Sequence, residues 1–334
     1  MTQSRREFLR QSVLATGAAV VGGAVMHSLG AAEAAEPQLL RIDTHQHLWD
    51  LSKQKMAWLT GAPAILKHDY RSEEYAAATA GRLMRTVYME IDIEEPQLDA
   101  EAELVIGLCQ NPKHPMVAAV IGGRPASKDF ESYIKKHAAS GHVKGVRQVL
   151  HGDPTPKGSC LQPEFVKGIQ LLGKMDLNFD LCMRPEDLRD ALQLTEKCPD
   201  TRFVLDHCGN ADVTAFVPGE AKPAHDPEAW KRDIEALAKR PNVFCKISGI
   251  IATAKPGWTA ATLAPVVNHC LDAFGPDRVV FGGDWPVCLL GAPLNDWISA
   301  LTTIIEKRPA ADREKLWSGN AKHVYRLPAD LKLA

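Results

Sequence analysis

Short apolar runs rich in β-branched residues alternate along this chain with longer segments in which apolar residues recur every three or four positions. The short runs predict eight β-strands, at residues 39–44, 86–92, 116–121, 144–150, 177–182, 202–206, 243–247 and 278–281. The longer segments predict eight intervening helices, at 72–83, 97–109, 128–139, 163–174, 185–197, 227–239, 259–274 and 294–305, and a last helix at 312–324. Strand followed by helix, eight times over about 300 residues, predicts a (β/α)8 TIM barrel in the α/β class, as a single domain over residues 39–327. A doubly wound open sheet is the competing layout, but no Gly-x-Gly-x-x-Gly follows the first strand.

The first 34 residues have the pattern of an export signal rather than of a barrel. Arg5 and Arg6 are followed by Phe8-Leu9, then by a small, glycine-rich apolar stretch at 12–29, and then by an Ala-x-Ala site at Ala32-Glu33-Ala34. The paired arginines predict the twin-arginine route, which exports folded proteins, and therefore a periplasmic location with no membrane association after cleavage. The alternative is an uncleaved membrane anchor, for which the stretch is barely long enough.

Composition excludes several classes of protein. The chain has 334 residues, 45% of them hydrophobic and 24% charged, with a formal net charge of −2, so neither a strongly basic nucleic-acid binder nor an acidic disordered tail is expected. Eight cysteines occur without any Cys-x-x-Cys pair, which excludes zinc-ribbon and thioredoxin-like sites. Because several of them lie in apolar strand-like runs, we expect buried free thiols in preference to a disulfide framework.

Polar residues at the predicted strand ends indicate where the chemistry lies, because barrel active sites form at the C-terminal ends of the strands. His45 and His47 follow the first strand with their side chains on the same side, and two imidazoles there suit one divalent ion or one polarised carbonyl. His207 follows the sixth strand, and Asp284 follows the eighth after two glycines that allow close backbone approach. A carboxylate in that position can bind a metal and accept a proton from water. His151, directly after the fourth strand, is the one further histidine that we place near the site.

Five motifs resemble those of the amidohydrolase-related TIM-barrel hydrolases, and the resemblance extends from about residue 41 to 327. They are His45-Gln46-His47-Leu48-Trp49, Leu205-Asp206-His207-Cys208-Gly209, Cys245-Lys246-Ile247-Ser248-Gly249, Phe281-Gly282-Gly283-Asp284-Trp285-Pro286-Val287 and Gly319-Asn320-Ala321. Within that superfamily the chain resembles the lactonase branch, which includes fuconolactonase, rhamnonolactonase and pyrone-dicarboxylate lactonase. The resemblance implies hydrolysis that opens a small lactone ring, with a sugar-acid lactone as the expected substrate.

Two departures from the superfamily pattern bear on the metal. Strand five lacks the usual histidine, and strand four has Arg147 where a bridging ligand would be expected, so a two-metal site is not predicted. We expect one divalent ion, zinc, with His45, His47, Asp284 and Glu90 as candidate ligands. The alternative is a metal-free site in which the three imidazoles donate hydrogen bonds, as in some lactonases of this kind.

The remaining candidate residues would bind substrate, and each has a structural alternative. Arg147 and Arg184 would hold a carboxylate or hydroxyls, or form buried ion pairs. Lys246 would donate to a hydroxyl or pair with Asp284. The rings of Trp49 and Trp285 would pack on a sugar face or on the barrel rim; Glu90 would instead pair with an arginine, and residues 52–70 would form part of a lid.

In the expected reaction, Asp284 takes a proton from water and His207 helps to hold the oxyanion. Two other functions stay open: a decarboxylase of the same superfamily, and a catalytically silent protein that binds a sugar acid. The expected partner is a small lactone or sugar acid, and the sequence leaves a homo-oligomer open.

Overall fold

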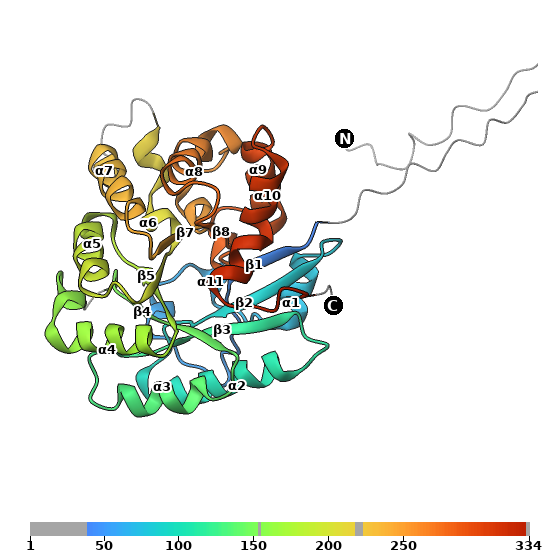
Figure 1. Ribbon diagram of the computed structural model, residues 1–334. Helices are drawn as coiled ribbons and strands as arrows, with labels where there is room; N and C mark the ends of the chain where they lie inside the picture. Colours follow the sequence, from blue (N-terminus) through green and yellow to red (C-terminus); the bar gives the residue numbers. More distant parts are fainter. Residues whose placement is uncertain (1–38, 153–154, 218–222, 332–334) are drawn as a thin grey trace, which may run out of the picture. The chain divides into compact units, whose positions relative to one another are not determined.

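Eight parallel strands form one sheet in the order in which they occur along the chain. The computed structural model describes residues 39–152, 155–217 and 223–331, so the predicted export signal, 1–34, lies outside the described residues. The strands are β1 (Arg41–Gln46), β2 (Met84–Met89), β3 (Met116–Gly122), β4 (Val143–Val149), β5 (Asn178–Cys182), β6 (Arg202–Leu205), β7 (Val243–Ile247) and β8 (Val279–Phe281). The end of β8 returns to β1: the amide of Asp284 donates to the carbonyl oxygen of His45 at 2.8 Å, and Gln46 forms a parallel bridge with Trp285. The sheet is therefore a near-closed parallel barrel, as the strand–helix alternation predicts (Figure 1).

One main helix follows each strand, and these helices surround the barrel (Figure 1). They are α1 (Ser72–Ala78), α2 (Leu98–Gln110), α3 (Phe130–Ala138), α4 (Pro163–Lys174), α5 (Leu188–Lys197), α7 (Pro227–Ala238), α8 (Ala260–Phe274) and α9 (Leu294–Ile305). Short helix α6 (His207–Asn210) comes directly after β6. Within the described residues, no helix combines the length and the apolar character that crossing a membrane requires.

The predicted C-terminal helix is divided into three parts. α10 (Ala310–Glu314) leads into a π-helical turn at Lys315–Gly319, which is followed by α11 (Asn320–Val324). The turn places Trp317 against Phe281 of β8, with ring centroids 4.8 Å apart, and the Asn320 side chain donates to the carbonyl oxygen of Val279 at 2.7 Å. The extra residue in the turn thus fits the helix to the end of the barrel.

The core has two apolar parts. The larger one lies between the strands and the helices, and it includes most of the eight cysteines, all of which are buried and unpaired. The smaller one combines apolar strand residues such as Ile42, Val120 and Val280 with Tyr325 from the C-terminal segment. The Tyr325 hydroxyl donates to Oδ2 of Asp180 at 3.0 Å, so this second cluster lies directly below a layer of buried charged groups.

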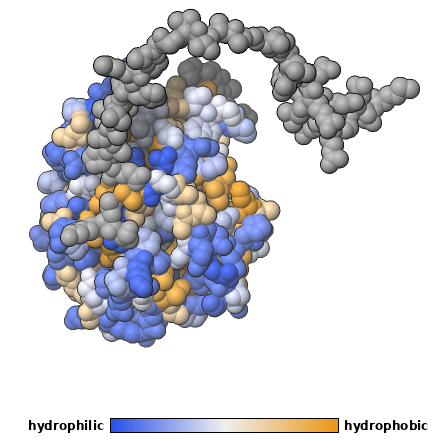
Figure 2. All heavy atoms as spheres, turned by 90° about the vertical axis from the view of Figure 1, so that its right-hand side faces the viewer, coloured by the Kyte–Doolittle hydropathy of each residue, from blue (hydrophilic) through white to orange (hydrophobic). Residues whose placement is uncertain are grey.

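Large apolar side chains on the surface are few and separated along the chain. In the described residues they include Leu51, Ile65, Leu104 and Leu290, each more than one third exposed. Figure 2 shows one face on which hydrophilic residues predominate and apolar residues lie in small groups.

Candidate functional site

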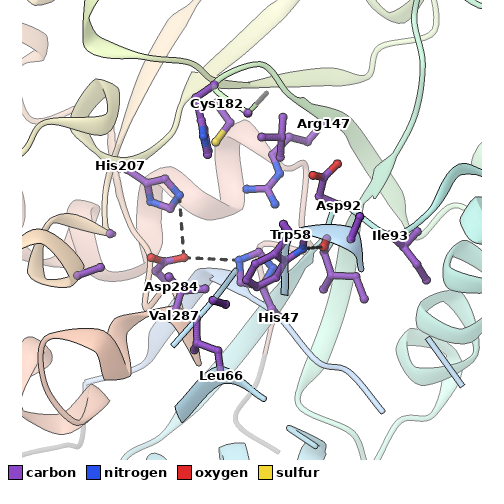
Figure 3. Close-up of a pocket in the computed structure, with 18 of the residues that line it drawn as sticks. His47, Trp58, Leu66, Asp92, Ile93, Arg147, Cys182, His207, Asp284 and Val287 are labelled. Atoms are coloured by element: carbon purple, nitrogen blue, oxygen red, sulfur yellow. Dashed lines mark hydrogen bonds and ion pairs between the residues drawn. The ribbon is translucent and has the colours of Figure 1, made fainter. Parts of the chain in front are cut away.

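A cavity of about 840 Å³ lies at the C-terminal ends of the strands, where barrel active sites form. Its lining includes His47, Arg147, His207 and Asp284, which follow or end four different strands, and residues of the loops after them (Figure 3). We expected His47, His207 and Asp284 to meet in one space, and the structure brings them together there.

Asp284 is the centre of this group. Its Oδ1 lies 3.5 Å from Nε2 of His47, 3.6 Å from Nε2 of His45 and 3.9 Å from Nε2 of His207. Figure 3 draws Asp284 between His207 and His47. These separations are too long for good hydrogen bonds. They are close to the spacing of about 3.0–3.6 Å between neighbouring ligand atoms that each lie about 2.0–2.2 Å from one zinc ion.

The hydrogen-bond partners and pKa shifts of the imidazoles also agree with a metal site. The carbonyl oxygen of Met89 lies 2.9 Å from Nδ1 of His47, and since a carbonyl can only accept, Nδ1 donates to it and Nε2 is the nitrogen that faces Asp284. Burial lowers the pKa of His207 and lowers that of His45 well below its usual value, so both rings are neutral at pH 7. One nitrogen each of His45 and His207 and a carboxylate oxygen of Asp284 all lie within 4.8 Å of one another, so these three groups could together hold one divalent ion.

The backbone around these groups is unusual, and it is shaped by close contacts. His207 and Asp284 both have left-handed conformations, with φ of 53° and 55°. Gly249 faces the His207 ring so closely that a Cβ at this position would lie 2.3 Å from Nδ1. Likewise, a Cβ on Gly283 would lie 2.4 Å from the carboxylate of Asp43. Glycine at these two positions is what allows the site to be this compact, as we expected for the residue before Asp284.

A layer of buried charged groups lies beside His45, next to the cavity but not in its lining. Nζ of Lys246 lies 2.7 Å from Asp180 and 2.8 Å from Asp206, and all three side chains are fully buried. Although burial opposes ionisation, Lys246 and then His45 hold the pKa of Asp206 well below its usual value. Lys246 therefore pairs with two carboxylates other than Asp284, and it is absent from the residues that line the cavity.

Arg147 and Glu90 form a buried ion pair. Nε of Arg147 donates to Oε1 of Glu90 at 2.6 Å, and Nη2 donates to the backbone carbonyl of Glu90 at 2.6 Å. Nη1 of Arg147 also lies 3.2 Å from Nε2 of His45. Of our candidate metal ligands, Glu90 is thus the one whose carboxylate is already engaged by a guanidinium group.

Arg184 and the two tryptophans belong to the surroundings of the site. Arg184 donates to the carbonyl oxygen of Leu150 at 3.3 Å and to Asp187 at 3.0 Å, and it does not line the cavity. Trp49 and Trp285 are each only 2% exposed and both pack edge-to-face on Tyr70. Trp49 borders the cavity whereas Trp285 does not.

Three residues that contact the candidate site residues were not singled out from the sequence. Asp43 accepts from the amides of His45 at 2.9 Å and Gly283 at 2.7 Å, which links the ends of β1 and β8. Oγ of Ser248 lies 2.9 Å from Nδ1 of His207 and fixes the orientation of that ring. Asp206 supports Lys246 and His45. Asp43 and Asp206 could have been found from the sequence, because they lie within two residues of the candidate ligands His45 and His207. His151 does line the cavity, and burial lowers its pKa to about 4.

Comparison with known proteins adds independent evidence. The amidohydrolase family model matches residues 42–327. The L-fucono-1,5-lactonase of Burkholderia multivorans is 28% identical over 316 residues, which cover 88% of this chain and 99% of that enzyme. The L-rhamnono-gamma-lactonase of Scheffersomyces stipitis is 25% identical over 335 residues, with 86% of this chain and 98% of that enzyme covered. A crystal structure of a Burkholderia multivorans amidohydrolase with bound zinc superimposes with a TM-score of 0.74 at 26% identity, covering 86% of this chain and all of that one. This chain belongs to the amidohydrolase family, in the branch whose named members are lactonases.

Proposed function

We propose that this protein is a hydrolase that opens a lactone ring, with Asp284 as the general base and acid. The observation that carries the proposal is the convergence of the Asp284 carboxylate with three imidazoles, where Asp284, His47 and His207 line a large cavity and His45 lies directly behind them. The names of the relatives agree with it, since both enzymes named above are lactonases.

The residues divide the work of the reaction. Asp284 accepts a proton from water as the oxygen of that water attacks the lactone carbonyl carbon. His207, held by Ser248, and His47, held by Met89, border the space in which the carbonyl oxygen becomes negatively charged. The ring C–O bond then breaks, and the proton held by Asp284 passes to the departing alkoxide, which leaves a hydroxy acid.

A divalent ion fits the donor set of His45, His207 and Asp284, with Nε2 of His47 3.5 Å from the same carboxylate, and zinc is the first choice. When bound, it supplies positive charge that stabilises the developing oxyanion and lowers the pKa of water. The amides of His45 and Gly283, through Asp43, keep the first and eighth strand ends at a fixed spacing around that position.

The proposal is tested by incubating the purified protein with a panel of lactones and following acid release with a pH indicator. Asp284→Asn should lower kcat by about 100-fold or more, because general acid–base catalysis contributes about 10²–10⁴-fold. Asp277→Asn is the matched control, since Asp277 pairs with Lys315 on the surface. Acid release by Asp284→Asn at the rate of the control would remove Asp284 from the mechanism. Release of carbon dioxide, or binding without turnover, would identify a decarboxylase or a silent binding protein instead.

A further inference from the structure

The cavity is larger than a monosaccharide lactone requires. A six-carbon sugar lactone has about a dozen non-hydrogen atoms, and even at the roughly 30 Å³ that one water molecule occupies in the liquid these would fill less than half of the cavity. Its volume of about 840 Å³ instead lies toward the upper end of the range of about 300–1,000 Å³ that is usual for drug-sized ligands.

The additional space is bounded by apolar side chains from three loops. Trp58 and Leu66 come from the segment after β1, Ile93 from the loop after β2, and Val287 and Leu290 from the segment after β8. Figure 3 shows Leu66 and Val287 on the side of Asp284 and Ile93 on the far side of His47. Hydroxyl groups of a sugar would find few partners on these walls, whereas an alkyl or aryl group would be removed from water.

The charges around the cavity do not favour an anionic ligand. Apart from Asp284, whose charge the proposed divalent ion would offset, three carboxylates line it, those of Asp92, Glu94 and Glu95, against two guanidinium groups. Arg147 is held by Glu90, as described above. Arg124 lies between two of the carboxylates, 3.9 Å from Asp92 and 3.9 Å from Glu95. A carboxylate on the substrate would therefore meet cations that are already neutralised, next to an excess of negative charge.

From size, walls and charge together we infer that the substrate is a neutral lactone bearing an apolar substituent, rather than a bare sugar lactone or a carboxylated one. This inference rests on the proposed lactonase function. The ring carbonyl would lie at Asp284 and the three imidazoles, and the substituent would lie along Trp58, Leu66 and Leu290.

The inference is tested with a homologous series of δ-lactones that differ only in the length of a linear alkyl substituent. Each methylene moved from water to an apolar wall should raise kcat/KM by up to about fourfold until the cavity is filled. A six-carbon sugar δ-lactone and a δ-lactone with a carboxylate in place of the alkyl end are the comparison substrates, and both should be turned over at least 10-fold less efficiently than the best alkyl lactone.

Leu290→Ser tests the wall itself. Leu290 lines the cavity and is 37% exposed, so its replacement does not disturb the core. The gain per methylene should fall in this variant and stay unchanged in Leu104→Ser, an equally mild change on α2 outside the cavity.

The possible results distinguish failure of the substrate inference from failure of the proposed lactonase function. A kcat/KM that does not rise with chain length, while the sugar or the carboxylated lactone is hydrolysed, would overturn the inference and retain the lactonase. An unchanged gain per methylene in Leu290→Ser would also overturn it. Failure to hydrolyse any lactone of either kind would overturn the proposed function, and this inference with it.

Discussion

Replacement of Gly249 by alanine is expected to disable the site through His207 without unfolding the protein. The new Cβ would lie 2.3 Å from Nδ1 of the His207 ring, where ordinary contact needs at least 3.4 Å. The ring must therefore move by about 1 Å, away from Ser248 and out of line with Asp284. A misplacement of about 1 Å in a catalytic group can cost about 100-fold in rate, and we expect a loss of this size in kcat/KM.

The same substitution also has a backbone cost, which must be separated from the loss of activity. Gly249 has a φ of 71°, a left-handed conformation that costs alanine about 1–2 kcal/mol. Gly257 provides the matched control, because its φ is 86° and nothing lies within 4 Å of the position of its Cβ. Gly257→Ala should therefore show the backbone cost alone, a few degrees in Tm, and keep its activity.

The assay is the steady-state hydrolysis of the best lactone by both variants, together with thermal unfolding followed by circular dichroism. We expect both variants to fold, with the lower Tm in Gly249→Ala because its Cβ also displaces the His207 ring, and a roughly 100-fold difference in kcat/KM. If Gly249→Ala hydrolyses the lactone within about threefold of Gly257→Ala, the placement of His207 is not what Gly249 provides, and the reasoning is refuted.

Three further predictions follow from the buried charges and the donor set. Removal of metal with a chelator should abolish hydrolysis and lower Tm, and added Zn²⁺ should restore both, because an ion that binds only the folded state stabilises it; full activity in metal-depleted protein would support the metal-free alternative. Lys246→Met should lower the free energy of unfolding by about 3–5 kcal/mol, since it leaves Asp180 and Asp206 buried without their cation; urea unfolding measures this, and a loss below about 1 kcal/mol would contradict it. Burial and the neighbouring Glu90 raise the pKa of Glu101 to about 8, whereas the pKa of a glutamate in the unfolded chain is about 4.3. Protonated Glu101 therefore contributes fully to stability below about pH 4.3, and this contribution is lost as the pH rises toward 8. Glu101→Gln, which cannot ionise, should gain stability relative to the original protein between pH 5 and pH 8, and parallel pH profiles of urea unfolding would disprove this.

The elements of the barrel could be predicted because each strand is a buried run with its own composition. The predicted strand at 243–247 has the bounds of β7, and that at 278–281 differs from β8 by one residue. The division of the last helix could not be foreseen, since it depends on how Trp317 packs on a strand that ends 36 residues earlier. Local pattern indicates which segments are buried, but it does not show which side chain they pack against.

In the candidate site, too, the sequence predicts where residues lie but not which partners they contact. Convergence of His45, His207 and Asp284 was predictable because barrel topology brings all strand ends to one face. The sequence could not choose between substrate binding and ion pairing for Arg147, which meets Glu90 across 57 residues of chain. Nor could it show that Lys246 serves Asp180 and Asp206, because strand periodicity gives the side on which a residue lies and not its partner.

The buried ion pairs of Lys246 with Asp180 and Asp206 limit where enzymes of this kind can change in sequence. Lys246, Asp180 and Asp206 are mutually dependent, so a change in any one of them endangers folding. Val287 and Leu290, by contrast, line the cavity from a short turn after β8 that lies outside this network, and both are partly exposed, so replacements there cost little. New substrate preferences can therefore accumulate at the rim of the barrel while the reaction at its centre is inherited without alteration.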